Sequence, residues 1–352
     1  MTELGRTEPE NCRPIGTAVL GLGRWGVHWL RNFAHHPAAN VVAIADSCAE
    51  NLAKAHTIVP DYAGYSTTDW QAAIAQPGVE AVVVVTPAVT HFELITTALE
   101  LGLHVLVEKP ITVTTAEARL ACELADRQQR VLMVDHTYLF NPVVQRGQTA
   151  VAALGDVRYA YGTRSHLGPV RQDVDVMWDL ALHDLVILNH WLGRSPIAVQ
   201  AKGQGWLQPD RALADTVWAE LTYPQGLQAT MHWSWANSDK QRRLGLVGSQ
   251  GTLIFDELGT ETLVLQQGEL ARRGDRFNPM HQQRQVLDYV PQEPLANACQ
   301  HFIDCVQRQQ QSSIASGWHG LGLVQILEGL AQSIAQNGTP IALEYGRSPV
   351  RT

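Results

Sequence analysis

A glycine-rich hexapeptide near the amino end constrains the fold of this chain more than any other feature. The residues Gly21-Leu22-Gly23-Arg24-Trp25-Gly26 follow an apolar run, Thr17–Leu20, that fits a buried strand. Apolar residues at helical spacing follow in Val27–Ala34, and a second apolar run, Val41–Ala45, leads into Asp46. The order strand, G-x-G-x-x-G, helix, strand and acidic residue is the fingerprint of a βαβ unit that binds a dinucleotide.

Each residue of this motif has a physical task. Gly21 permits the tight turn after the strand, Gly23 lets the backbone approach a pyrophosphate, and Gly26 lets helix and strand pack closely. The positive end of the helix then faces the phosphates. Asp46 lies about 20 residues after Gly26, which suits an acceptor for ribose hydroxyls, and its charge would repel a 2′-phosphate. The motif therefore predicts NAD rather than NADP, bound by residues 21–26 and Asp46. Alternatively, Asp46 is an ordinary polar residue after a strand.

Composition narrows the class of partner. A length of 352 residues predicts two domains, and a net charge of −8 without a basic run excludes a nucleic-acid backbone and favours small metabolites. The five cysteines are odd in number and form no C-x-x-C pair, which argues against a disulfide framework and a structural metal site. The amino-terminal segment has no apolar core, and no apolar run reaches the ~18 residues of a membrane span. We therefore expect a cytoplasmic protein that does not bind membranes.

The first part of the chain alternates apolar strands with amphipathic helices. The predicted strands are 17–20, 41–45, 81–85, 104–107 and 131–134. Capping-box pairs mark three helix starts, at Thr68, Thr90 and Thr114, and Gly102 marks a helix end. The alternation predicts an α/β Rossmann domain with a doubly wound parallel sheet over residues 15–137, after a loosely attached segment 1–14. Ligands bind such sheets at the carboxyl ends of strands, which selects residues 86–87 and 108–110 as well.

The pattern changes beyond residue 137. Short β-like segments separated by turn signals occur at 156–166, 216–223, 227–235, 243–247 and 251–255. Predicted helices span 177–192, 295–308 and about 320–336, and residues 268–294, rich in Gln and Arg, are expected to form a loop. Residues 138–352 are therefore predicted to form an α+β domain with an antiparallel sheet and helices on one face.

Three segments carry residues suited to chemistry. Lys109 follows a strand end, where its ammonium can stabilise negative charge on a substrate hydroxyl. Asp179 and His183 share one helix face, so the imidazole can move a proton while the carboxylate orients it or touches substrate. The alternatives are an exposed lysine and a structural histidine. Thr86-Pro87 and Thr90-His91 either line the nicotinamide ribose or simply form a strand end, a turn and an N-cap, with His91 facing solvent.

Four ordered motifs resemble the glucose–fructose oxidoreductase / inositol dehydrogenase (Gfo/Idh/MocA) family. They are Gly21–Gly26, Thr86-Pro87 with His91, Glu108-Lys109-Pro110 and Asp179-x-x-x-His183, and the resemblance extends from Ile15 to about Ile341. It implies a Rossmann domain and an open-faced, mainly antiparallel sheet that often forms the interface of a homodimer or homotetramer. It also implies that Lys109 contacts the substrate hydroxyl, that His183 is the acid/base and that Asp179 supports both. By the same resemblance, the cofactor site would also include Thr86, Pro87, His91, Glu108 and Lys109. The Lys109–Pro110 bond would be cis.

A narrower resemblance is to the sugar-nucleotide branch of that family, which includes enzymes similar to UDP-N-acetylglucosaminuronate 3-dehydrogenase. Three segments carry it, residues 23–33, 136–142 and 167–174. Leu182 and His166 depart from that branch, where proline and asparagine are usual, and leave the exact sugar open. We expect an NAD-dependent dehydrogenase acting on a secondary hydroxyl of a sugar or sugar nucleotide. Arg164 and Arg171 are candidates for a substrate phosphate or carboxylate, or are solvated charges. The alternatives are an inositol or other polyol dehydrogenase and a non-catalytic NAD-binding sensor.

Overall fold

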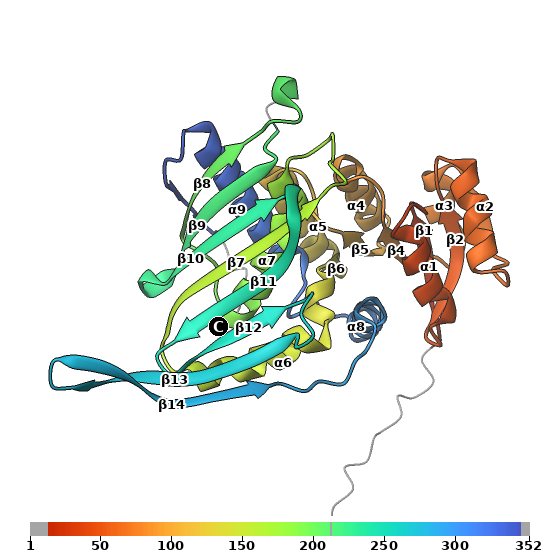
Figure 1. The fold of residues 1–352 in the computed structure, drawn as a ribbon. Coiled ribbons are helices and arrows are strands. Elements are labelled where there is room, and N and C mark those ends of the chain that lie inside the picture. Colours follow the sequence, from red (N-terminus) through yellow and green to blue (C-terminus); the bar gives the residue numbers. More distant parts are fainter. Residues whose placement is uncertain (1–12, 212, 346–352) are drawn as a thin grey trace, which may run out of the picture. The chain divides into compact units, whose positions relative to one another are not determined.

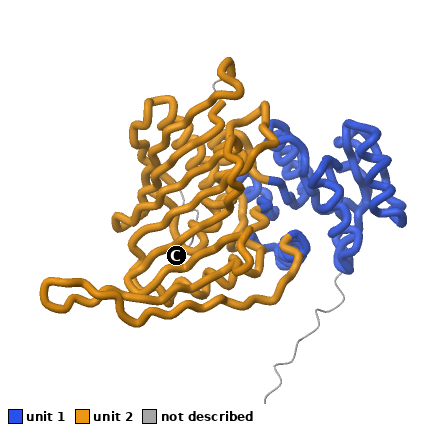
Figure 2. Tube along the Cα trace, in the orientation of Figure 1, with its two compact units in different colours: residues 1–108, 120–135, 295–312 blue, residues 109–119, 136–294, 313–352 orange. Residues whose placement is uncertain are grey.

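Two compact units make up the computed structural model, which describes residues 13–211 and 213–345 (Figures 1 and 2). Unit 1 comprises residues 1–108, 120–135 and 295–312, and unit 2 comprises residues 109–119, 136–294 and 313–352. Each unit is therefore built from three segments of the chain, whereas the sequence suggested one division after residue 137. Within the described residues, no helix is both long enough and apolar enough to cross a membrane.

Unit 1 is a Rossmann fold, as predicted. Its six parallel strands lie in the order β3-β2-β1-β4-β5-β6, and β1 and β4 are buried along their whole length. The strands are β1 Ile15–Leu20, β2 Ala39–Ala45, β3 Tyr65–Thr67, β4 Ala81–Val84, β5 His104–Glu108 and β6 Leu132–Asp135. The helices are α1 Gly26–His35, α2 Ala49–Ile58, α3 Trp70–Ile74, α4 His91–Glu100, α5 Thr115–Gln128 and α8 Pro294–Arg308, with the short η1 Ala88–Thr90 before α4. The first turn of α5, residues 115–119, and the first residue of α8 are assigned to unit 2. The five expected strands are confirmed, and β3 is an additional edge strand.

The predicted caps at Thr114 and Gly102 are confirmed, whereas the cap at Thr68 is not. Thr114 accepts a hydrogen bond of 3.2 Å from a first-turn amide of α5, as its capping box predicts. The prediction for Thr68 is wrong, because Asp69 is the N-cap of α3 and accepts from two backbone amides. Thr90 occupies the N-cap position of α4 but makes no capping hydrogen bond with its side chain. Gly102 follows the end of α4 with φ +75°, as expected for a residue that stops a helix.

Unit 2 contains a mixed nine-stranded sheet in the order β14-β13-β12-β11-β7-β10-β9-β8-β15. β7 and β10 are parallel, and the remaining pairs are antiparallel. The strands are β7 Val157–Leu167, β8 Ala198–Gln204, β9 Thr216–Thr222, β10 Gln228–Ser234, β11 Ala236–Gly248, β12 Gly251–Asp256, β13 Leu263–Arg273, β14 Arg276–Val286 and β15 Ile341–Ala342. The helices are α6 Pro142–Ala150, α7 Val176–Leu192 and α9 Gly317–Ala335, with short turns η2 Thr137–Phe140, η3 Val151–Leu154, η4 Pro209–Arg211 and η5 Pro224–Gly226. α7 and α9 pack behind the sheet (Figure 1), and most of α7 is buried.

The loop predicted over 268–294 is wrong for most of its length. β13 and β14 form a long hairpin through this segment, and Gly274, with φ +62°, lies in the turn between them. Beyond Leu265 most side chains of the hairpin are exposed. The alternation of apolar and polar residues that reveals a half-buried strand is therefore missing here.

Candidate active site

Two glycines of the motif in unit 1 are required by close packing. Gly21 has φ +88°, and a β-carbon there would lie 2.5 Å from a backbone oxygen just after β4. A β-carbon at Gly26 would lie 1.9 Å from the Gly21 oxygen. At Gly23, by contrast, none of the described atoms lies within 4 Å of that position. Arg24 and Trp25, with the guanidinium 5.9 Å from the ring centroid, are exposed on the same turn. The turn thus leaves room for a ligand at the glycine to which a pyrophosphate contact was assigned, so its residues fit a dinucleotide.

Asp46 directly follows β2 and holds the glycine turn in position through hydrogen bonds. Its carboxylate accepts from the backbone amides of Leu22 at 2.6 Å and Cys48 at 2.8 Å. The Asn51 side-chain amide lies 3.2 Å from both carboxylate oxygens. Ribose hydroxyls that bind this carboxylate would therefore either share it with the Asn51 amide or displace that amide from it. Sequence reasoning missed Asn51, because nothing in the motif specifies that position.

The loops after β4 and β5 are held by buried side chains. His91 is 1% exposed, and its Nε2 lies 2.9 Å from the Thr86 carbonyl oxygen, so the alternative in which His91 faces solvent is wrong. The hydroxyls of Thr86 and Thr90 are 2.7 Å apart. Glu108 accepts a hydrogen bond of 3.0 Å from the Trp29 indole of α1. These contacts position both strand ends, and contact with NAD stays a prediction for these residues.

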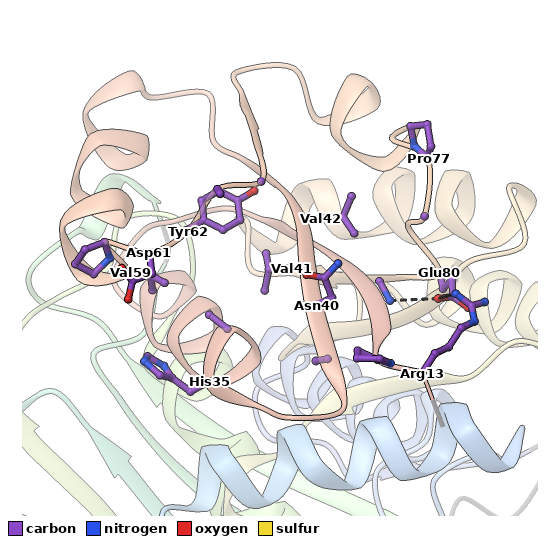
Figure 3. Close-up of a pocket in the computed structure, with 18 residues that line it drawn as sticks. Arg13, His35, Asn40, Val41, Val42, Val59, Asp61, Tyr62, Pro77 and Glu80 are labelled. Carbon is purple, nitrogen blue, oxygen red and sulfur yellow. Dashed lines mark hydrogen bonds and ion pairs between the residues drawn. The ribbon is translucent and has the colours of Figure 1, made fainter. Parts of the chain in front are cut away.

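A cavity of about 750 Å³ lies elsewhere in unit 1 (Figure 3). It is lined by residues near the amino ends of β1, β2 and β4, among them Gly16, Asn40 and Glu80, and by the segment between α2 and β3, which includes Tyr62. The ion pair between Arg13 and Glu80, 2.7 Å long, lies at its margin. The glycine turn and Asp46 lie at the opposite ends of these strands, so this cavity is separate from the predicted cofactor site.

The three catalytic candidates belong to unit 2, where two of them are in direct contact. The Lys109 ammonium donates a hydrogen bond of 3.1 Å to the backbone oxygen of Asp179, in the first turn of α7. Asp175 caps this helix by accepting from the Trp178 amide at 3.0 Å, which fixes where the helix starts. His183 follows one turn after Asp179. The Lys109–Pro110 peptide bond is cis, as the resemblance implies.

The environment of His183 favours its neutral form. Burial lowers the pKa of His183 well below its usual value, and the positive charges of Lys109 and Arg164 lower it further. The Tyr138 ring lies against the imidazole, with centroids 5.3 Å apart. The imidazole is therefore held in the unprotonated form that a general base requires.

Arg164 lies at the centre of a buried hydrogen-bond network. It is 2% exposed, and two of its nitrogens donate to one Asp184 carboxylate oxygen at 2.9 and 2.7 Å. A third nitrogen donates to the Tyr138 hydroxyl at 3.0 Å, and that hydroxyl donates to Glu257 at 2.5 Å. The Trp233 indole donates to the other Asp184 oxygen at 2.9 Å. We call these five residues the Arg164 network. Its members are widely spaced along the chain, so no sequence motif marks them, and contact of Arg164 with substrate stays a prediction.

Arg171 is held by two carboxylates near the start of α7. It donates to Asp173 at 2.9 Å and 2.5 Å, and another of its nitrogens lies 3.6 Å from the Asp179 carboxylate. Hydrogen bonding to Asp173 raises the pKa of Arg171. Arg171 therefore extends the candidate site along the loop before α7. Among the described residues, no group of three or more His, Cys, Asp or Glu side chains is arranged to hold a metal ion.

A Rossmann unit with an open glycine turn, and a second unit in which a lysine contacts the helix that carries an aspartate and a histidine, are the features expected of a dinucleotide-binding oxidoreductase. A model of the oxidoreductase family with an NAD-binding Rossmann fold (GFO_IDH_MocA) matches residues 15–136. A model of the GFO/IDH/MocA C-terminal domain matches residues 150–254. The chain therefore belongs to the Gfo/Idh/MocA family of NAD-binding oxidoreductases.

Three similar proteins illustrate the range of this family. UDP-N-acetylglucosamine 3-dehydrogenase of Acidithiobacillus ferrooxidans is 30% identical over 65% of this chain and 69% of its own length. The NAD⁺-dependent scyllo-inositol 2-dehydrogenase of Bacillus subtilis is 26% identical over 95% of this chain and 98% of its own. The crystal structure of a putative oxidoreductase from Magnetospirillum magnetotacticum has a TM-score of 0.78 and 29% identity, covering 90% of this chain and 99% of that one.

Proposed function

We propose that this protein is an NAD-dependent dehydrogenase that oxidises a secondary hydroxyl of a sugar or sugar nucleotide to a ketone. The observation that carries the proposal is the Lys109–Asp179–His183 cluster, in which a cation lies close to a neutral imidazole. Membership of an NAD-binding oxidoreductase family supports the redox chemistry. The similarity to a nucleotide-sugar 3-dehydrogenase supports the substrate class.

In this mechanism His183 accepts the proton of the substrate hydroxyl, while hydride leaves the carbon that bears this hydroxyl. Lys109 stabilises the negative charge that develops on the substrate oxygen, and its hydrogen bond to the Asp179 backbone holds the ammonium in place. NAD, when bound, supplies the hydride acceptor. The Arg164 network supports His183 through the Tyr138 ring. Positioning is the main contribution of the protein to such a reaction.

For the cofactor, we propose that residues 21–26 hold the pyrophosphate, that Asp46 selects NAD over NADP, and that residues 86–87, His91 and residues 108–109 border the nicotinamide half. Replacement of Asp46 by serine removes the charge that opposes a 2′-phosphate and also releases the Leu22 amide. We expect the KM for NAD to rise about tenfold or more and activity with NADP to appear. Unchanged KM values for both cofactors would exclude this role of Asp46.

On the substrate side, Arg171 and Arg164 are proposed ligands of a phosphate or carboxylate. Arg171 is the more accessible of the two, with a side chain that is 43% exposed against 3% for Arg164. An Arg171→Gln variant is expected to raise the KM for a charged substrate without a matching change for an uncharged polyol. Equal changes for both substrates would show that Arg171 acts only on the loop before α7.

We further propose a cytoplasmic homodimer or homotetramer that associates through the open face of the nine-stranded sheet. Tyr159 and Trp218 are about half exposed on β7 and β9, and Trp218 stacks on His232 of β10 with centroids 5.4 Å apart. Light scattering of the wild-type protein and a Trp218→Glu variant tests this arrangement. A wild-type monomer would contradict it.

NADH formation with a panel of nucleotide sugars, free sugars and inositols tests the proposed activity. We expect turnover with at least one nucleotide sugar. Turnover confined to inositols would favour the polyol dehydrogenase, which the similarity to scyllo-inositol 2-dehydrogenase over nearly the whole chain supports. Binding of NAD without turnover on any member of the panel would favour the sensor.

A further inference from the structure

An arginine that no motif marks lies beside the Arg164 network. Arg242 of β11 is the direct cross-strand partner of Arg164 of β7. Residues directly opposite each other in an antiparallel pair place their side chains on the same face of the sheet. The Arg164 side chain donates to Asp184 of α7, so Arg242 also lies on the face of the sheet that α7 covers. Arg243, the next residue along β11, lies on the opposite face.

Contacts through Glu257 connect Arg242 to the candidate base. Arg242 Nη1 donates to Glu257 Oε1 at 2.5 Å, and the Glu257 backbone amide donates to the Arg242 carbonyl oxygen at 3.0 Å. The other carboxylate oxygen of Glu257 accepts from the Tyr138 hydroxyl, and the Tyr138 ring lies against the His183 imidazole. Arg242 is therefore linked to the candidate base through two side chains.

Arg242 and Arg164 differ in the donors that they have left for a ligand. All three side-chain nitrogens of Arg164 donate to Asp184 or Tyr138, and this side chain is 3% exposed. The side chain of Arg242 is 32% exposed, and in the described part of the chain only its Nη1 has a hydrogen-bond partner. Its Nε and Nη2 can therefore donate to a ligand. A guanidinium presents such a pair of donors to two oxygens of a carboxylate or phosphate.

The electrostatic environment of His183 also favours an anionic group nearby. Burial has the largest effect on the pKa of His183, and the side chains of Lys109, Arg164 and Arg242, which are all cations, lower that pKa further. Positive charge around a partly dehydrated site attracts an anionic group of a ligand and strengthens the hydrogen bonds to it. Arg242 supplies this charge where the side chain is still accessible to a ligand.

We propose that Arg242 is a further substrate-binding residue, which binds an anionic group of the substrate close to the carbon that is oxidised. This inference rests on the proposed dehydrogenase function and narrows its substrates to acidic compounds, either a sugar with a carboxylate or a nucleotide sugar with a diphosphate. Arg242 Nε and Nη2 donate to oxygens of the anionic group, while Nη1 stays on Glu257 and fixes the orientation of the guanidinium.

Four ligands distinguish the two sources of negative charge. UDP-glucuronate carries a diphosphate and a carboxylate, UDP-glucose only the diphosphate, glucuronate only the carboxylate, and glucose neither. Isothermal titration calorimetry gives their Kd values for the full-length protein saturated with NAD. In an Arg242→Gln variant, the Kd of each ligand that carries the recognised group should rise about tenfold or more, because a charged hydrogen bond is lost. A loss with both UDP sugars would identify the diphosphate, and a loss with UDP-glucuronate and glucuronate would identify the carboxylate.

Two further variants act as controls. Arg243→Gln removes the same charge from the same strand on the opposite face, where Arg243 pairs with Asp256, and should leave all Kd values unchanged. Arg242→Lys keeps the charge without the paired donors and should retain only part of the affinity. Equal Kd values of the wild-type protein and Arg242→Gln for all three anions, or an equal loss with glucose, would overturn the proposal.

The wild-type protein alone also tests the inference, should Arg242→Gln not fold. Its affinity for glucose should be lower than for at least one of the three anions, and absence of binding of all three would overturn the proposal. NADH formation confined to uncharged sugars or inositols would leave the dehydrogenase function in place and overturn this narrower inference. Binding of an anion that depends on Arg242, without NADH formation on any substrate, would instead contradict the proposed function alone.

Discussion

Replacement of Arg164 by methionine is expected to destabilise unit 2 strongly. The substitution keeps most of the side-chain volume but removes the three nitrogens that contact Asp184 and Tyr138. Asp184 is 1% exposed and would keep only the Trp233 indole as a side-chain donor among the contacts described above. Removal of one partner from a buried ion pair costs about 3–5 kcal/mol, because the remaining charge is left in a medium of low dielectric constant. At 2–4 °C per kcal/mol, the expected loss in Tm is about 10 °C.

Thermal unfolding followed by near-ultraviolet circular dichroism measures this loss, since Trp233 belongs to the network. Arg243→Met is the matched control, because Arg243 pairs with Asp256 at 3.2 Å on the surface, where an ion pair contributes about 0–1 kcal/mol. Adding Asp184→Leu to Arg164→Met should recover part of the lost stability, because the unpaired charge is then gone. An Arg164→Met variant no less stable than the control would show that the buried pair of Arg164 and Asp184 does not stabilise unit 2.

Two further predictions concern pH and the glycine turn. Burial lowers the pKa values of His104, His136 and His319 to about 4, 3 and 4, so their neutral forms stabilise the folded state fully above pH 6.5. As the pH falls from 6.5 towards those values, each of these histidines should lower the free energy of unfolding of the protein by about 1.4 kcal/mol per pH unit. A urea midpoint that is the same at pH 7 and 5.5 would contradict this. Gly26→Ala should lower the Tm without NAD, because its β-carbon meets the Gly21 oxygen, whereas Gly23→Ala should keep the Tm and weaken NAD binding. Melting curves with and without NAD distinguish the two variants, and the reverse pattern would be inconsistent with the roles assigned to these glycines.

Much of the fold was predictable because its signals are local. The strands of unit 1 are short apolar runs that form a sheet buried on both faces, and such runs stand out against their polar surroundings. The helix α7 was predicted to within one residue, since Gly193 ends it in a left-handed conformation. The hairpin β13–β14 was not predicted because its two strands pair with each other. Most of the hairpin does not pack against a core, so no apolar pattern is imposed on its sequence.

The candidate site was predictable only in part. Lys109, Asp179 and His183 are found from motif spacing and family resemblance, and the structure brings Lys109 to the first turn of α7. The surrounding contacts depend on tertiary packing: Tyr138 of η2 lies against His183, and Arg164 of β7 donates to Asp184 of α7. Residues so far apart in sequence leave no pattern that can be recognised before the fold is known.

Turnover of the His183→Ala variant tests whether His183 is the general base of a hydride-transfer reaction. We predict a loss of about 10²–10⁴-fold in NADH formation, with the Kd for NAD nearly unchanged and activity partly restored by added imidazole. Turnover within a few-fold of the wild-type protein, or a loss explained entirely by weaker NAD binding, would contradict it.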